Sequence, residues 1–151
     1  MKKGFKKPQT FAYPFGARNR EIDNALLKYF VSLRGVTYTG SDGCISNLDR
    51  AFFSGSSRKV FFGVGIDRIY GNSVETIIEG LRRAKKENEV LILYGHKISK
   101  DPGEYVINPQ KLKKMLDFVY STEKLCFYTI SDLGDFDSTR YNLEINKCQQ
   151  N

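Results

Sequence analysis

The 151-residue chain lacks tryptophan and contains only one histidine and three cysteines. The cysteines, Cys44, Cys126 and Cys148, have no C-x-x-C spacing, which argues against a metal site held by thiolates. Their odd number argues against a complete disulfide framework. We therefore expect three free thiols, with Cys126 buried in the core because it lies between Leu125 and Phe127.

Long apolar runs are missing as well. No segment approaches the roughly 18 apolar residues of a membrane-spanning helix. Met1-Lys2-Lys3 is similar to the start of a signal peptide, but no apolar segment follows it before Pro8. The sequence therefore predicts no membrane span and no signal peptide, and it leaves the localisation unknown.

Basic residues outnumber acidic residues by 24 to 17, which gives a net charge of +7. Such a charge can indicate an anionic partner. The excess lies in an N-terminal arm (Lys2, Lys3, Lys6, Lys7) and late in a predicted helix, where cations complement the helix dipole (Arg82, Arg83, Lys85, Lys86). No aromatic-basic recognition motif accompanies these charges, so we expect no nucleic-acid partner.

The chain is 40% hydrophobic and long enough to bury one sizeable core. We expect a flexible basic arm over residues 1–8, a single domain over residues 9–145 and a frayed tail over residues 146–151. The longest irregular stretch, residues 40–57, either lines a site or is mobile.

The first part of the domain predicts a strand, a turn and a helix. Gln9–Tyr13 has a strand pattern that Pro14 terminates, because proline cannot donate to a strand ladder. Asn19 suits the N-cap of a helix that Gly35 stops, and Val36–Thr39 follows as a short strand. We expect one buried helix face because apolar residues recur at helical spacing: Ile22, Ala25, Leu26, Tyr29, Phe30 and Leu33.

The remainder predicts further strands and helices. The strands are Lys59–Val64, Glu89–Tyr94 and Leu125–Ile130, and a turn covers Asp67–Asn72. Ser73 caps a second helix with the stripe Val74, Ile77, Ile78, Leu81 and Ala84. Asn108 caps a third helix, with Pro109 in its first position and the stripe Leu112, Met115, Leu116 and Val119.

Strands that alternate with helices indicate βαβ units, so the fold class is α/β. The sequence provides about five strands and three to four helices. A closed α/β barrel usually needs roughly 200 residues or more. We therefore expect no closed barrel within this chain.

Three segments carry a resemblance to a known family. Phe11-Ala12-Tyr13-Pro14-Phe15-Gly16 resembles the F-R-x-P-Y-G motif of polysaccharide deacetylases (carbohydrate esterase family four), metal-dependent enzymes that remove acetyl groups from N-acetylated sugars. Val90–His96 is similar to the family's strand that ends in a catalytic histidine. Phe127–Leu133 is similar to its final strand and turn. From about Phe11 to Leu133, the chain thus resembles the C-terminal half of a chitooligosaccharide deacetylase homology domain.

The resemblance implies a partial (β/α) barrel-like parallel sheet that lacks the family's first strands. Those strands carry the catalytic aspartate and the Asp-His-His metal ligands, and only ten residues precede the motif here. An open edge of parallel strands must be paired or covered, so we expect self-association or a complementary chain. Ala12 also replaces the motif's arginine, which orients the catalytic aspartate.

His96 is the candidate catalytic residue. It follows an apolar strand, and groups at the C-terminal ends of strands line the sites of α/β folds. The resemblance implies that it is the general acid that protonates the departing sugar amine, a role that suits an imidazole. The alternative is a strand-end histidine that only hydrogen-bonds a loop.

The resemblance also implies roles for other residues. Phe15 corresponds to the residue whose backbone N–H stabilises the tetrahedral oxyanion. Tyr38 would stand in for the tryptophan that often lines the family's acetyl pocket, and Tyr13 and Tyr94 would bind substrate with it.

A catalytic metal needs about three His, Asp or Glu ligands and an open position for water. One histidine cannot supply the family's two, so we expect no metal site and no cofactor in this chain alone. A complete family domain would hold a zinc-type divalent ion. Asp132, Asp135 and Asp137 lack the spacing of a calcium loop and are interpreted as turn and cap residues.

Two functions stay open. The first is a deacetylase-like hydrolase that cleaves a non-peptide carbon-nitrogen bond in N-acetylated carbohydrate polymers and is incomplete or inactive as a lone chain. The second is a non-enzymatic carbohydrate-binding or structural interaction module. A third, a basic protein that binds nucleic acid or anionic surfaces, is disfavoured by the distribution of charge.

Overall fold

A computed structural model describes residues 7–40, 43–54 and 58–130 of the chain. Most of the predicted basic arm and the whole predicted tail lie outside these residues. Cys148 and the three aspartates of the predicted turn, Asp132, Asp135 and Asp137, lie outside them too. None of the helices in the described ranges is long and apolar enough to cross a membrane.

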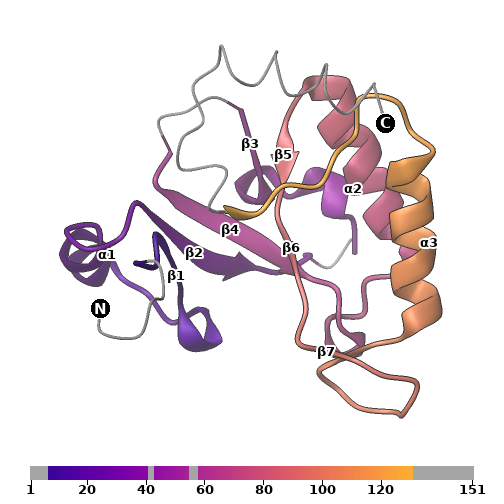
Figure 1. The fold of residues 1–151 in the computed structure, drawn as a ribbon, viewed down its shortest axis with the longest axis horizontal. Helices are drawn as coiled ribbons and strands as arrows, with labels where there is room; N and C mark the ends of the chain where they lie inside the picture. The colour runs from indigo at the N-terminus through magenta and orange to yellow at the C-terminus, as the bar shows by residue number, and fades with distance from the viewer. Residues whose placement is uncertain (1–6, 41–42, 55–57, 131–151) are drawn as a thin grey trace.

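Four parallel strands form the central sheet, in the order β1-β2-β4-β6. They are β1 (Thr10–Ala12), β2 (Ser32–Thr37), β4 (Val60–Gly65) and β6 (Leu93–Tyr94). The sheet curls into a half-barrel (Figure 1). Two small pairs accompany it: β3 (Phe52–Phe53) with β5 (Val90–Leu91), antiparallel, and β7 (Lys97–Ile98) with β8 (Val106–Ile107), parallel. The α/β class is thereby confirmed.

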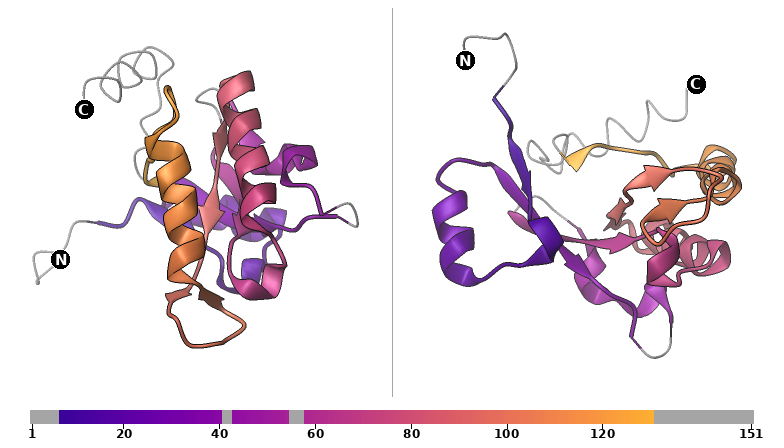
Figure 2. Two further views of the ribbon diagram at one scale, coloured as in Figure 1. Left: turned by 90° about the vertical axis from the view of Figure 1, so that its right-hand side faces the viewer. Right: turned by 90° about the horizontal axis from the view of Figure 1, so that it is seen from below.

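Three α-helices accompany the sheet: α1 (Arg20–Leu26), α2 (Val74–Glu87) and α3 (Pro109–Tyr120). Helices α2 and α3 lie side by side at the β4–β6 end, and α1 lies at the opposite end, beyond β1 (Figures 1 and 2). The predicted caps are confirmed, because Ser73 Oγ accepts from Thr76 N and Asn108 Oδ1 accepts from Gln110 N. Short 3₁₀ turns link the elements: η1 (Pro14–Gly16), η2 (Ile45–Asn47), η3 (Asp49–Ala51) and η4 (Arg68–Tyr70).

The first helix is shorter than predicted. It ends at Leu26, and the chain enters β2 at Ser32, so Leu33 and Gly35 belong to the strand rather than to the helix and its stop. The predicted buried face is also wrong, because Ile22 is 43% exposed and Asp23 is the buried residue of α1. Strand pairing on both edges of β2 decides this boundary: Leu33 lies opposite Phe11 on one side and Val60 on the other.

Two predicted strands are also corrected. Glu89–Tyr94 is not continuous, because Ile92 separates β5 from β6, which pair with different partners. Leu125–Ile130 forms no strand and runs as an irregular segment after α3 (Figure 1). Its apolar side chains still pack against the two core clusters. Burial therefore occurs there without strand pairing.

The cysteine prediction holds only in part. Cys44 keeps its thiol, with Sγ 2.9 Å from the Ser46 hydroxyl. Cys126 is disulfide-bonded and half-buried, so it is neither a free thiol nor a core residue.

The core lies on both faces of β4. Val64 belongs to the larger cluster, which α2 and α3 cover, whereas Phe61 belongs to a smaller cluster with Phe53 and Ile92. A parallel strand buried on both faces is expected to be apolar throughout, and β4 has the sequence VFFGVG. The larger cluster comprises Ile45, Ala51, Phe52, Val64, Ile66, Ile77, Leu81, Ala84, Ile107, Met115 and Val119.

A pair of substitutions tests the corrected boundary between α1 and β2. Leu33 is 0% exposed, so Leu33→Ala is expected to lower the free energy of unfolding by about 2–5 kcal/mol through lost burial and a cavity. Ile22→Ala is expected to cost less than about 1 kcal/mol, because Ile22 is partly exposed. Urea denaturation measures both. Equal penalties would contradict the structure, since the predicted helix places both residues on one buried face.

Candidate functional site

A pocket of about 910 Å³ opens at the carboxyl ends of the four parallel strands. Each strand delivers residues to it, because parallel strands end at the same edge of a sheet. β1 leads into the turn at Pro14–Gly16, β2 into Tyr38 and Thr39, and β6 into His96. The lining residues are Ala12, Tyr13, Pro14, Phe15, Gly16, Arg34, Val36, Thr37, Tyr38, Thr39, Gly65, Ile69, Tyr70, Asn72, Tyr94, His96 and Tyr105.

His96 is paired with a buried aspartate, Asp67, which follows β4. The His96 Nδ1 atom lies 2.6 Å from Asp67 Oδ2, and the His96 backbone N–H donates to Oδ1 at 3.0 Å. Asp67 is 0% exposed, whereas the His96 side chain is 50% exposed. A carboxylate accepts hydrogen bonds but cannot donate them, so Nδ1 carries a proton. Nε2 is then the ring nitrogen left to exchange a proton with a bound molecule.

The surroundings of Asp67 fix this pair in place. A Cβ atom on Gly95 would overlap Ile107 and come within 3.3 Å of Asp67 Oδ1, so only glycine lets the strand end approach so closely. Lys111 reaches toward Asp67 from α3, and its ammonium donates to the Asn72 carbonyl. Burial lowers the pKa of Lys111, and the charge of Asp67 partly opposes that shift.

The turn after β1 holds Phe15 in a left-handed conformation, with φ 55° and ψ 11°. This region is strained for a bulky residue. The turn is closed by a hydrogen bond from Gly16 N to the Tyr13 carbonyl, and Gly16 packs so closely on Val36 that a Cβ there would overlap it. The Phe15 side chain is 99% exposed at the pocket rim. Its backbone N–H has no hydrogen-bond partner within the described ranges.

Tyr13 is anchored beneath this turn. Its hydroxyl donates to Asp23 Oδ1 at 2.7 Å, and Arg18 forms a bidentate ion pair with the same carboxylate. Burial, and then the hydrogen bond to Asp23, raise the pKa of Tyr13 to about 12. The hydrogen bond from Arg18 holds the pKa of the Asp23 carboxyl below its usual value. Tyr13 therefore lines the pocket with its ring while its hydroxyl is committed to α1.

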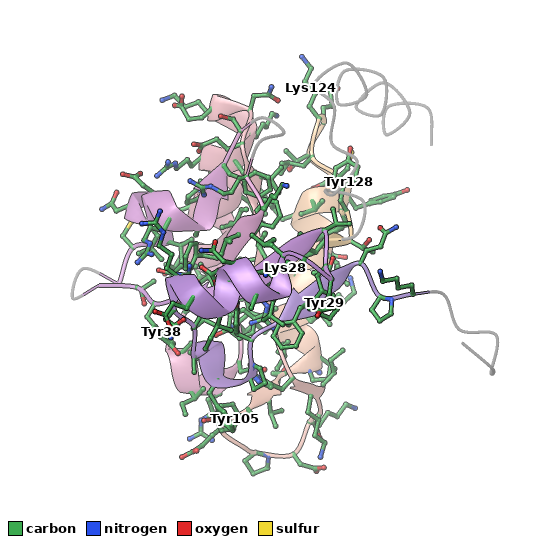
Figure 3. All side chains as sticks on the ribbon, turned by 90° about the vertical axis from the view of Figure 1, so that its left-hand side faces the viewer. Lys28, Tyr29, Tyr38, Tyr105, Lys124 and Tyr128 are labelled. Atoms are coloured by element: carbon green, nitrogen blue, oxygen red, sulfur yellow. The ribbon has the colours of Figure 1, made fainter. Side chains whose placement is uncertain are left out.

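Tyrosines make up much of the pocket wall. The ring centroids of Tyr70 lie 6.1 Å from Tyr38 and 5.6 Å from Tyr94, and the imidazole of His96 lies 6.0 Å from Tyr94 and 5.1 Å from Tyr105. Tyr38 and Tyr105 are half-exposed, and Figure 3 shows Tyr105 near the lower end of the molecule, Tyr38 above it on the left and Tyr128 at the upper right. These ring contacts run from the rim of the pocket to His96, the candidate catalytic residue.

The residues described do not fit a catalytic metal. No three side chains of His, Cys, Asp or Glu lie together in the described ranges. Of the described residues that line the pocket, none is Asp or Glu, and His96 is the only histidine in the sequence. No step can therefore be assigned to a metal held by these residues.

The structure brings the five predicted site residues, Tyr13, Phe15, Tyr38, Tyr94 and His96, to one pocket. Sequence reasoning missed four further residues: Arg34, Asp67, Tyr70 and Tyr105. Asp67 could have been found by the argument used for His96, because it also follows an apolar strand directly. Nothing in the sequence marks Tyr105, which reaches the pocket from the loop between β7 and β8.

No protein-family model matches the chain, and no curated protein or solved structure is significantly similar to it.

The buried ion pair beneath the turn predicts a pH dependence. The folded-state pKa of Asp23 is lowered, so its stabilising effect is present above the unfolded-state pKa of about 3.9 and is lost as the pH falls below that value. Asp23→Asn is expected to lower the unfolding free energy by about 1.5–3 kcal/mol at pH 7 and by less at pH 2–3. Urea denaturation between pH 2 and 7 measures this. The control, Asp117→Asn, removes an exposed pair with Lys113 and should change little; a constant Asp23→Asn penalty would contradict the assignment.

The Asp67–His96 pair predicts a single tautomer. At a pH where the imidazole is neutral, its proton is expected on Nδ1, because Asp67 is an acceptor only. In Asp67→Asn the amide can also donate, so the Nε2–H tautomer should gain population. Long-range ¹H–¹⁵N NMR reads this directly, since the chain has one histidine. Asp101→Asn, at an exposed acid near Ser99, is the control. An unchanged tautomer in Asp67→Asn would show that Asp67 does not set the imidazole's proton.

Proposed function

We propose that this chain is polysaccharide deacetylase-like, forms part of a site for N-acetylated carbohydrate polymers and is incomplete as a lone chain. In this proposal it supplies the acid/base histidine and the sugar-binding walls of the site. The observation that carries the proposal is the Asp67–His96 pair at the mouth of a tyrosine-walled pocket, on the carboxyl edge of a parallel sheet. Groups so placed line the active sites of α/β enzymes.

His96 acts as the general acid in the proposed reaction. Hydrolysis of an N-acetyl group adds water to the carbonyl carbon, breaks the carbon-nitrogen bond and leaves an amine that takes up a proton. The imidazolium form of His96 delivers that proton from Nε2, which leaves the ring neutral with its remaining proton on Nδ1, bonded to Asp67, and solvent restores the proton on Nε2; Asp67 acts as a positioning residue. Asp67 lies in the bend between β4 and η4, so its contact with His96 also fits the alternative of a loop-bonding histidine. The general-acid role is supported by the ring of His96, which remains half-exposed in the pocket.

Phe15 supplies an oxyanion donor in the same proposal. The Phe15 backbone N–H, which has no partner among the described residues, is a fixed dipole at a strained turn and needs no reorganisation as charge develops on the carbonyl oxygen. The Phe15 ring, fully exposed at the rim, offers a surface for the apolar face of a sugar.

The missing metal ligands would come from outside the described residues. β1 pairs with β2 alone in the part of the sheet that the structure describes, so its outer edge can accept another strand. The pocket begins at the end of this same strand, at Ala12. A complementary chain, or a second copy, that pairs with β1 would therefore bring its own strand end next to the pocket.

A second candidate is a non-enzymatic carbohydrate-binding module. It is favoured by the absence of a group of metal ligands in the described ranges, together with a pocket wall that contains Tyr13, Tyr38, Tyr70, Tyr94 and Tyr105. Both candidates require sugar binding, and they differ in what His96 does.

Binding of chitotetraose tests what the two candidates share. Tyr38→Ala removes a half-exposed ring from the pocket and is expected to weaken binding about tenfold, or about 1.4 kcal/mol. Tyr120→Ala is the matched control, because Tyr120 is 90% exposed on α3 and does not line the pocket. Isothermal titration calorimetry measures both. Equal affinities, or no binding to the wild-type chain, would contradict the proposal.

Hydrolysis of an activated acetyl ester, 4-nitrophenyl acetate, separates the two candidates without a metal. A deacetylase-like site predicts hydrolysis that His96→Gln abolishes and chitotetraose inhibits competitively. A binding module predicts sugar binding with no hydrolysis that depends on His96. We expect no acetate from chitotetraose itself, because one histidine cannot complete the Asp-His-His ligand set.

A further inference from the structure

Arg34 lies within the pocket and has no acidic partner among the residues that the structure describes. It sits in the middle of β2, in register with Ala12 of β1, and its guanidinium carbon lies 4.6 Å from the ring centre of Tyr94. The side chain is half-buried and lines the pocket. Within the described ranges it forms no ion pair and no side-chain hydrogen bond. Its only side-chain interaction of note there is the stacking on Tyr94.

An arginine in this state is unusual, because arginines that lose solvent are normally paired with an anion. The guanidinium remains charged, and it carries five N–H donors in a planar fork. Arg18 and Arg83 illustrate the normal arrangement, since each forms ion pairs with nearby carboxylates. Stacking on Tyr94 orients Arg34 but satisfies none of its N–H donors.

The other described residues of the pocket do not neutralise this positive charge. None of the described lining residues is acidic, and the carboxylate of Asp67 is buried behind His96. The Tyr94 hydroxyl is buried and has no hydrogen-bond partner of normal geometry in the described part of the chain. Burial raises the pKa of Tyr94 well above its usual value, and the neighbouring Tyr70 raises it further, so this hydroxyl is a neutral donor. The pocket thus offers a cation, with no acidic side chain among its described lining residues.

We propose that Arg34 binds a carboxylate carried by the sugar ligand, so that the pocket selects acidic N-acetylated sugars over neutral ones. This inference rests on the proposed function and narrows its ligands from N-acetylated sugars in general to acidic ones. A planar carboxylate matches the guanidinium fork through two parallel hydrogen bonds. A phosphate group carries up to two charges, and among the described lining residues there is no second arginine and no lysine to balance it. The single cation therefore favours a carboxylate.

Two ligands of the same size test the inference: N-acetylmuramic acid and its methyl ester, which is neutral. The acid is expected to bind the wild-type chain about tenfold more tightly than the ester at low salt and to shift the Arg34 Nε–H signal in ¹⁵N-HSQC spectra. In Arg34→Gln this preference should disappear, so that the two ligands bind alike. Arg82→Gln, at an exposed arginine of α2 that does not line the pocket, should keep the preference.

Three results would overturn the inference: equal affinity of acid and ester for the wild-type chain, a preference that survives in Arg34→Gln, or no shift of the Arg34 signal with the acid. The first comparison needs no variant, so it decides the matter even if Arg34→Gln fails to fold. Binding of both sugars with equal affinity would leave the proposed function standing. If sodium acetate shifts the Arg34 signal while neither sugar binds, Arg34 is a carboxylate site and the proposed sugar function fails.

Discussion

Parallel pairing of β1, β2, β4 and β6 is the constraint on which the rest of the structure depends. Because all four strands run in one direction, their carboxyl ends meet at one edge, and residues from Ala12 to Tyr105 gather there although they are far apart in the sequence. The same pairing buries β4 on both faces and sets the boundary between α1 and β2. A sheet with one reversed strand would scatter these groups.

The pocket concentrates features that cost stability. Phe15 adopts a left-handed conformation; among the described residues, Arg34 loses solvent without an anionic partner, and the Tyr94 hydroxyl is buried without a hydrogen bond of normal geometry. The helices α2 and α3 are capped, and the two core clusters are apolar. Left-handed residues also occur away from the pocket, at Asn88 and Lys124, but the pocket combines a left-handed residue with a half-buried cation and a buried hydroxyl, a combination typical of a functional site.

The acidic and basic side chains at the pocket differ in burial. The acid, Asp67, is buried and contacts the imidazole of His96, whereas Arg34 lines the pocket. Asp23 is likewise a buried carboxylate: it accepts a hydrogen bond from Tyr13, and Arg18 neutralises its charge. Both carboxylates serve as supports, which leaves neutral and positive groups to meet a ligand. The two proposals draw on this one arrangement.

Local signals in the sequence determined α2 and α3, β4 and the turn after β1, because a cap, a helical period or a proline acts within a few residues. The sequence also marked His96, which follows a strand. The helical spacing of apolar residues predicted Leu33 in the first helix, because this spacing continues by chance into strand β2. Only the tertiary structure decided that boundary, the break at Ile92, the irregular path of residues 125–129, the contact of Asp67 with His96 and the place of Arg34 in the pocket. Each of these depends on contacts between segments distant in sequence, which no local pattern encodes.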